Sequence, residues 1–212
     1  MTKAIFFDFD DTLGNRELAA YNLYKDLLKP YFSDDLLLQS AIQDILVFEQ
    51  YGNCNKRQVQ KQFEKRYNVK LQFDLPVIWE EYIAKYSLPF DDTIETLEYL
   101  KKKYKLGVIT NGLTSTQHGK IEQSGIKDYF DVIVTSEEVN CNKPSKQIFV
   151  YAADKIGEDI KDCVYVGDVF SNDVYGALNA GMQAVWHWRR GFRKYEADVV
   201  RIDCLKQLID LY

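Results

Sequence analysis

Short apolar runs alternate with helical patterns along much of the chain. The first run begins at Ile5, and four further runs rich in Val, Ile and aromatic residues cover 106–110, 132–135, 163–167 and 184–188. Runs of this length are typical of buried strands. Between the later runs, residues 94–104 and 146–156 place apolar side chains at helical spacing, with Ser145 as a predicted N-cap. The alternation predicts βαβ units, and therefore an α/β fold with a parallel sheet.

Residues 15–89 follow a different pattern, in which no convincing strand occurs. Helical stretches lie near residues 18–28, 36–50, 56–67 and 77–85. The breaks between them fall at Pro30, Gly52, Asn53, Asn68 and Pro76. A βαβ unit takes about 30 residues, whereas the second predicted strand ends only at Thr110. We therefore expect a helical insertion over residues 15–89, between the first and second strands of a core formed by residues 1–14 and 90–212.

The charge balance of the chain argues against a general nucleic-acid binder. The 212 residues carry a net charge of -5, whereas nucleic-acid binders need positive charge to displace counterions from phosphates. The insertion holds equal numbers of acidic and basic residues, so the net negative charge belongs to the predicted α/β core. The one basic cluster, at residues 189–195, is interpreted as a solvated loop rather than a phosphate contact.

Neither a membrane segment nor a zinc site is expected. Charged residues interrupt the apolar runs after a few positions, and the start of the chain lacks a signal-peptide pattern, so we predict a cytoplasmic protein. The cysteines are far apart, without a C-x-x-C pair, and are interpreted as isolated thiols. The sequence predicts no particular oligomeric state.

Three carboxylates crowd the end of the first predicted strand. Asp8, Asp10 and Asp11 follow the apolar run within four positions. On an extended strand Asp8 and Asp10 would share one side, while Phe9 would point to the other. Such carboxylates repel one another unless a cation or a chemical task holds them together. The strand end is therefore a candidate cation or catalytic site.

Matching chemistry follows three other predicted strands. The polar residues in question are Thr110 and Asn111, then Lys143, then Asp168, Asn172 and Asp173. A hydroxyl, an amide and a lysine bind anions, and carboxylates are the hard oxygen ligands that Mg²⁺ prefers. Each residue alone has an ordinary interpretation as a turn or a solvated side chain. Because ligands bind at the carboxyl ends of parallel strands, the ordered set favours one functional site.

In this order, the residues resemble the four motifs of the haloacid dehalogenase superfamily. The motifs are D-x-D-x-T at Asp8, Asp10 and Thr12, then Thr110, Lys143 and the segment GDVFSND. The insertion is similar to the four-helix C1-type cap of the subgroup with phosphoglycolate phosphatase, 5′-nucleotidases and β-phosphoglucomutase. The resemblance implies a Rossmann-like core with an inserted helical cap domain. It departs from the common pattern at Asp11, where many members have glycine.

The resemblance further implies a Mg²⁺-dependent phosphohydrolase that acts on a small phosphorylated metabolite through an aspartyl-phosphate. Asp8 would be the nucleophile, and we expect its carboxylate to be ionised at pH 7 without a neighbouring base. Asp8, the backbone carbonyl of Asp10 and Asp168 would hold the Mg²⁺, with Asp173 supporting it through water. The Asp10 side chain would protonate the leaving oxygen and later deprotonate water.

The remaining motif residues would bind the phosphoryl group. The hydroxyl of Thr110 and the backbone amide of Asn111 would contact its oxygens, and Lys143 would neutralise its charge and orient Asp8.

Several alternatives stay open on these residues. A phosphomutase of the β-phosphoglucomutase type differs only in where the phosphoryl group goes next. A phospho-aspartate receiver module also gathers acids, a Thr and a Lys, but on a shorter chain and around an interior strand. A dehalogenase would need neither Asp10 nor the pair Asp168 and Asp173. The sequence leaves the substrate open among sugar phosphates, nucleoside monophosphates and phosphoglycolate-like acids.

Overall fold

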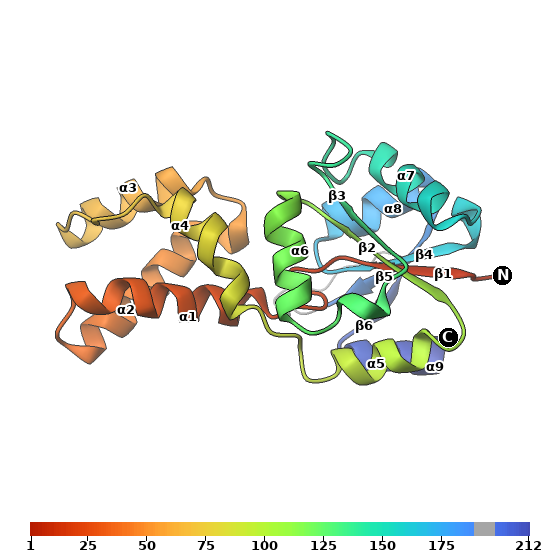
Figure 1. Ribbon diagram of the computed structural model, residues 1–212, viewed down its shortest axis with the longest axis horizontal. Coiled ribbons are helices and arrows are strands. Elements are labelled where there is room, and N and C mark those ends of the chain that lie inside the picture. The colour runs from red at the N-terminus through yellow and green to blue at the C-terminus, as the bar shows by residue number, and fades with distance from the viewer. Residues whose placement is uncertain (189–197) are drawn as a thin grey trace. The chain divides into compact units, whose positions relative to one another are not determined.

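The computed structural model describes residues 1–188 and 198–212, which divide into two compact units (Figure 1). One unit combines Met1–Asn15 with Pro89–Tyr212, and the other is Arg16–Leu88. The basic cluster at residues 189–195 lies outside the described residues.

The first unit is built on a six-stranded sheet in which every pair of neighbours is parallel. Its strands, in spatial order, are β3 (Val132–Thr135), β2 (Lys105–Thr110), β1 (Ala4–Phe7), β4 (Cys163–Gly167), β5 (Gln183–His187) and β6 (Val200–Ile202). The predicted α/β fold is confirmed. The sixth strand was not predicted, because β6 has three residues and only Ile202 is buried, which leaves no apolar run to detect.

Helices cover both faces of this sheet. One face packs on α5 (Thr93–Leu100), α6 (Thr114–Gln123) and α9 (Leu208–Leu211), and the other on α7 (Lys146–Ile156) and α8 (Tyr175–Ala180) (Figure 1). Strand β1 shows the alternation: Ile5 and Phe7 belong to the first face, and Ala4 and Phe6 to the second. The predicted N-cap Ser145 accepts a hydrogen bond from the amide of Gln147 at the start of α7.

The order of the strands places a switch point at β1. From β1 the chain moves outward to β2 and β3, then returns to pair β4 with the opposite side of β1. In such sheets the carboxyl ends of the strands on either side of the switch form the usual ligand-binding crevice. Asp8, Thr110 and Asp168 stand at or directly after these strand ends.

Strand β1 is shorter than the sequence pattern suggested. It ends at Phe7, and Asp8 adds one more hydrogen bond, from its amide to the carbonyl of Val166. Asp11 then adopts a φ of 58°, in the left-handed region that favours glycine, and its amide bonds to the carbonyl of Gly14 at 2.8 Å. Phe9 is buried in the same core as Ile5 and Phe7, as the predicted alternation requires, and the turn over residues 11–13 follows Asp10. Glycine would adopt the φ of Asp11 without strain.

The second unit is helical and has its own core. It contains α1 (Arg16–Leu28), α2 (Asp35–Glu49), α3 (Lys56–Tyr67) and α4 (Leu75–Tyr82), with short 3-10 helices at Lys29–Tyr31, Gln50–Gly52 and Ile83–Tyr86. Trp79 packs against Tyr24, with ring centroids 5.9 Å apart, and Phe48 lies against the same core. These contacts agree with the interpretation of the aromatic residues as packing rather than a base-stacking surface. Over the described residues, no helix is long and apolar enough to cross a membrane.

Candidate active site

Lys143 connects three segments of the first unit through its buried ammonium group. Its Nζ lies 2.7 Å from Oδ1 of Asp8, 2.8 Å from Oδ1 of Asp173 and 2.8 Å from the hydroxyl of Tyr165. The side chain of Lys143 is 3% exposed, so water screens these contacts weakly. The segments that follow β1, β3 and β4 thus meet at one charged centre, as the order of the predicted site residues suggested.

Tyr165 belongs to this centre although it was not among the predicted site residues. Its hydroxyl donates to the carbonyl of Ile109 at 2.8 Å, which leaves the oxygen lone pairs to accept from Lys143. The ring packs edge-on against Phe149, with centroids 5.2 Å apart. The sequence signal was a tyrosine inside an otherwise apolar strand, where a buried hydroxyl must find a partner.

Asp8 and Asp173, which contact Lys143, form with Asp168 a group of carboxylates that could hold a cation. Asp8, Asp168 and Asp173 each offer one oxygen, and these oxygens all lie within 4.8 Å of one another. Three ionised carboxylates beside one ammonium leave two negative charges, which a divalent cation would balance, and carboxylate oxygens are the ligands that Mg²⁺ selects. The donor set therefore fits a divalent metal ion.

Gly167 makes room for one of these carboxylates. A Cβ at Gly167 would lie 2.5 Å from both Cβ and Cγ of Asp173, closer than real carbon atoms approach. The second oxygen of Asp173 accepts a hydrogen bond from the amide of Val169 at 2.9 Å. The glycine before Asp168 is thus required for the close approach of Asp173 to the strand end.

Burial changes the ionisation of the proposed nucleophile. Burial raises the pKa of Asp8 to about 7, and the charges of Asp173 and Asp10 act in the same direction, while Lys143 opposes them. Burial alone would lower the pKa of Lys143, but Asp173 and Asp8 outweigh it and raise this pKa, so the lysine stays charged. The expectation that Asp8 is ionised at pH 7 without a neighbouring base stays a prediction: burial opposes its ionisation, and the charge of Lys143 favours it.

Asn111 ties the end of β2 to the segment that carries Lys143. Its Oδ1 accepts from the amide of Lys143 at 2.8 Å, and its Nδ2 donates to the carbonyl of Lys143 at 3.2 Å. The side chain of Asn111 thus fixes the backbone of the lysine. Thr110, which is 1% exposed, lies next to it and contacts Nε2 of Gln117 through Oγ1 at 2.8 Å.

Asp10 contacts two residues of α6 that were not predicted. Nζ of Lys120 lies 3.0 and 2.9 Å from its two oxygens, and Nε2 of Gln117 lies 3.1 Å from Oδ2. Gln117 and Lys120 are three positions apart, so they share one side of the helix. That spacing was the sequence signal by which the two residues could have been found. It was not decisive, because a helix with a polar pattern is more often exposed to solvent.

Comparison with known proteins agrees with this geometry. The sequence model of the family described as haloacid dehalogenase-like hydrolase matches residues 5–187, which is most of the chain. The chain belongs to this family. The resemblance seen in the sequence is thereby confirmed, and the chain is a hydrolase.

The relatives of this hydrolase include phosphatases from bacteria and archaea. Pyrimidine 5′-nucleotidase YjjG of Escherichia coli (strain K12) is 31% identical over 189 residues, which cover 86% of this chain and 84% of that protein. A glyceraldehyde 3-phosphate phosphatase of Methanopyrus kandleri is 33% identical over 205 residues, covering 92% and 87%. The crystal structure of a HAD phosphatase from Thermococcus onnurineus is 33% identical, has a TM-score of 0.69 and covers 99% of this chain and 97% of its own.

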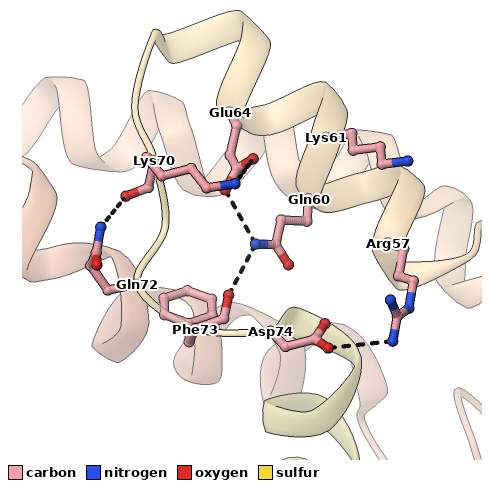
Figure 2. Close-up of a pocket in the computed structure, with 8 residues that line it drawn as sticks. All are labelled: Arg57, Gln60, Lys61, Glu64, Lys70, Gln72, Phe73 and Asp74. Carbon is pink, nitrogen blue, oxygen red and sulfur yellow. Dashed lines mark hydrogen bonds and ion pairs between the residues drawn. The ribbon is translucent and has the colours of Figure 1, made fainter.

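The helical unit of this hydrolase carries a separate depression between α3 and the segment before α4 (Figure 2). Its polar side chains bond to one another: Nε2 of Gln60 donates to the carbonyl of Phe73 at 2.9 Å, and Lys70 pairs with Glu64 at 3.4 Å. Arg57 likewise pairs with Asp74 at 3.4 Å. These contacts fasten the segment to α3, so we assign the depression a structural role.

Proposed function

We propose that this chain is a Mg²⁺-dependent phosphohydrolase that acts on a small phosphorylated metabolite through an aspartyl-phosphate on Asp8. The proposal depends mainly on one observation: Lys143 lies in contact with both Asp8 and Asp173, inside a carboxylate group that fits a divalent cation. A nucleophile, a cation site and an anion-binding lysine together are what phosphoryl transfer needs. The phosphatase names of the relatives support the same reaction class.

The first half-reaction moves the phosphoryl group to the protein. An oxygen of ionised Asp8 attacks phosphorus, and a bond forms as the bond to the leaving oxygen breaks. Asp10 gives its proton to that oxygen, which departs as an alcohol. The hydroxyl of Thr110 and the backbone amide of Asn111 bind the phosphoryl oxygens, and Lys143 neutralises their charge.

The second half-reaction restores the protein. Asp10, now ionised, takes a proton from water as the water oxygen attacks phosphorus. The bond between phosphorus and Asp8 breaks, and inorganic phosphate leaves. Asp10 is then protonated again for the next turnover, so one residue serves both halves.

The proposed metal ligands are Asp8, the backbone carbonyl of Asp10 and Asp168, with Asp173 acting through water. A bound Mg²⁺ would supply positive charge between the carboxylates and the incoming phosphate. Because burial raises the pKa of Asp8 to about 7, that charge also favours the ionised nucleophile.

We further propose that residues 15–89 act as a cap domain that recognises the leaving group. The insertion leaves the core at Asn15 and returns at Pro89, and it has a core of its own. A cap suits a small substrate rather than a protein or nucleic acid, because it excludes bulky chains and water. A metabolite substrate also fits the predicted cytoplasmic location.

The proposal is tested by measuring phosphate release from a panel of sugar phosphates, nucleoside monophosphates and phosphorylated acids, with and without Mg²⁺. We expect at least one to be hydrolysed only with the metal, and the Asp8→Asn protein to be inactive. A panel left intact by folded protein with Mg²⁺ would overturn the proposal. Transfer of the phosphoryl group to a second sugar hydroxyl, without phosphate release, would favour a phosphomutase instead.

A further inference from the structure

We propose that Lys120, together with Gln117, is a positioning residue that holds the Asp10 carboxyl group in place for proton transfer. This inference rests on the proposed function, because it assigns Asp10 the role of proton donor to the leaving oxygen. It concerns α6, which carries none of the motif residues.

The contact between Lys120 and Asp10 has the geometry of a holding interaction. Nζ of Lys120 reaches both carboxylate oxygens, at 3.0 and 2.9 Å, so rotation of the carboxyl group would lose one contact. The lysine side chain is 6% exposed and that of Asp10 is 23% exposed. The ammonium is therefore shielded from water, whereas part of the Asp10 side chain stays exposed.

Gln117 links the same carboxylate to the phosphate-binding end of β2. Its Nε2 lies 3.1 Å from Asp10, 2.8 Å from Oγ1 of Thr110 and 2.7 Å from the carbonyl of Asn111. Gln117 is 2% exposed, and its amide packs closely over Gly112, where a Cβ would lie 3.2 Å from Nε2. The proposed proton donor and the proposed phosphate-binding residues thus share one buried amide.

Helix α6, which carries both Gln117 and Lys120, is anchored in the hydrophobic core. Ile121, next to Lys120 in sequence, is fully buried in the core between the sheet and α5, α6 and α9. A buried lysine contributes little to stability, since removing its charge from water offsets much of the gain from pairing. An apolar side chain could fill the buried position of Lys120 on α6. The lysine there therefore favours a role in the reaction.

The reaction gives this role a measurable signature. Aryl phosphates such as 4-nitrophenyl phosphate release a weakly basic oxygen that needs little protonation, whereas alkyl phosphates depend on the proton donor. The ratio kcat/KM reports only the steps up to release of the alcohol. A displaced Asp10 should therefore lower kcat/KM for alkyl phosphates and largely spare the aryl substrate.

The test compares Lys120→Met and Lys120→Arg with the unaltered protein, in excess Mg²⁺, on 4-nitrophenyl phosphate and the best alkyl phosphate of the panel. We expect Lys120→Met to lower kcat/KM for the alkyl substrate about tenfold or more, with about a twofold change for the aryl one. Lys120→Arg, which keeps a bidentate cation, should recover part of the loss. Gln117→Met should likewise lower kcat/KM for the alkyl substrate more than for the aryl one.

The matched control is Lys127→Met, because Lys127 lies just after α6 and pairs with Glu122 on the surface. It should leave both substrates unchanged. Equal losses on the two substrates, or no loss in variants that melt like the unaltered protein, would overturn the inference. If Lys120→Met does not fold, the values of kcat/KM for Gln117→Met on the two substrates decide whether the inference holds. An unaltered protein that hydrolyses neither substrate would instead refute the proposed function.

Discussion

Lys143 Nζ and Asp8 Oδ1 lie 2.7 Å apart, in a buried contact between residues 135 positions apart in sequence. The contact joins the end of the first strand to the loop before α7. It also opposes the effect of burial on the Asp8 carboxyl group, whose pKa burial raises to about 7. In the proposed reaction, the lysine thus affects both the charge of Asp8 as nucleophile and the positive charge that faces a bound phosphate.

Replacing this lysine should impair the reaction severely. Lys143→Met removes the positive charge beside Asp8 and Asp173, and should lower kcat about 100-fold or more. Steady-state kinetics on the best substrate would measure it. Lys146→Met, three residues along and exposed on α7, is the matched control and should be nearly silent. Similar activities for both variants would contradict the role given to Lys143.

Metal affinity should depend on pH near neutrality. Because Asp8 has a pKa of about 7 in the metal-free protein, protons compete with Mg²⁺ for its oxygen below that pH. The apparent Kd for Mg²⁺ should rise about tenfold per pH unit below 7 and level off above it. Calorimetry at pH 6, 7 and 8 would show this trend. Asp8→Asn should bind more weakly with little pH dependence, and an unaltered slope in that variant would exclude Asp8 as its source.

The hydroxyl of Tyr165 should contribute to stability. Tyr165→Phe removes the oxygen that accepts from Lys143 and donates to Ile109, and should cost about 1–3 kcal/mol of unfolding free energy. Denaturant unfolding would measure the loss. Tyr151→Phe removes an exposed hydroxyl that bonds Glu138, and should cost far less. Equal costs would mean that the buried hydroxyl has no special role.

Asp173 should matter more for metal binding than for chemistry. Asp173→Asn keeps the shape of the side chain but removes one charge from the acidic group, so Mg²⁺ should bind more weakly. Activity should return largely as Mg²⁺ is raised, which a metal titration of kcat would reveal. Asp154→Asn, an exposed carboxylate on α7, should leave the titration unchanged. A loss of kcat that excess metal does not reverse would assign Asp173 a direct catalytic part.

The sequence predicted the elements whose signals are local. Five of the six strands appear where apolar runs mark them, and the structure brings the residues after three of those strands together at Lys143. Ser145 caps α7 because the helix start has a short-range signature. Strand β6 was not predicted because it is three residues long and only Ile202 in it is buried.

The features of the site that the sequence did not predict depend on tertiary contacts. Gln117 and Lys120 sit on a helix whose pattern is polar, and only the fold shows that their side chains are buried against Asp10. The ionisation of Asp8 likewise depends on desolvation by its surroundings, which no spacing of carboxylates encodes. The sequence therefore predicted groups that the structure brings together, but not how their side chains are held.

The paired hydrogen bonds between the Asn111 side chain and the Lys143 backbone have a consequence for protein engineering. They join the loop before α7 to the residue that follows β2, so the two segments form one structural unit. A chimera that exchanged the lysine loop alone would bring in a backbone without its amide partner. Grafts between relatives at this position should carry both segments together.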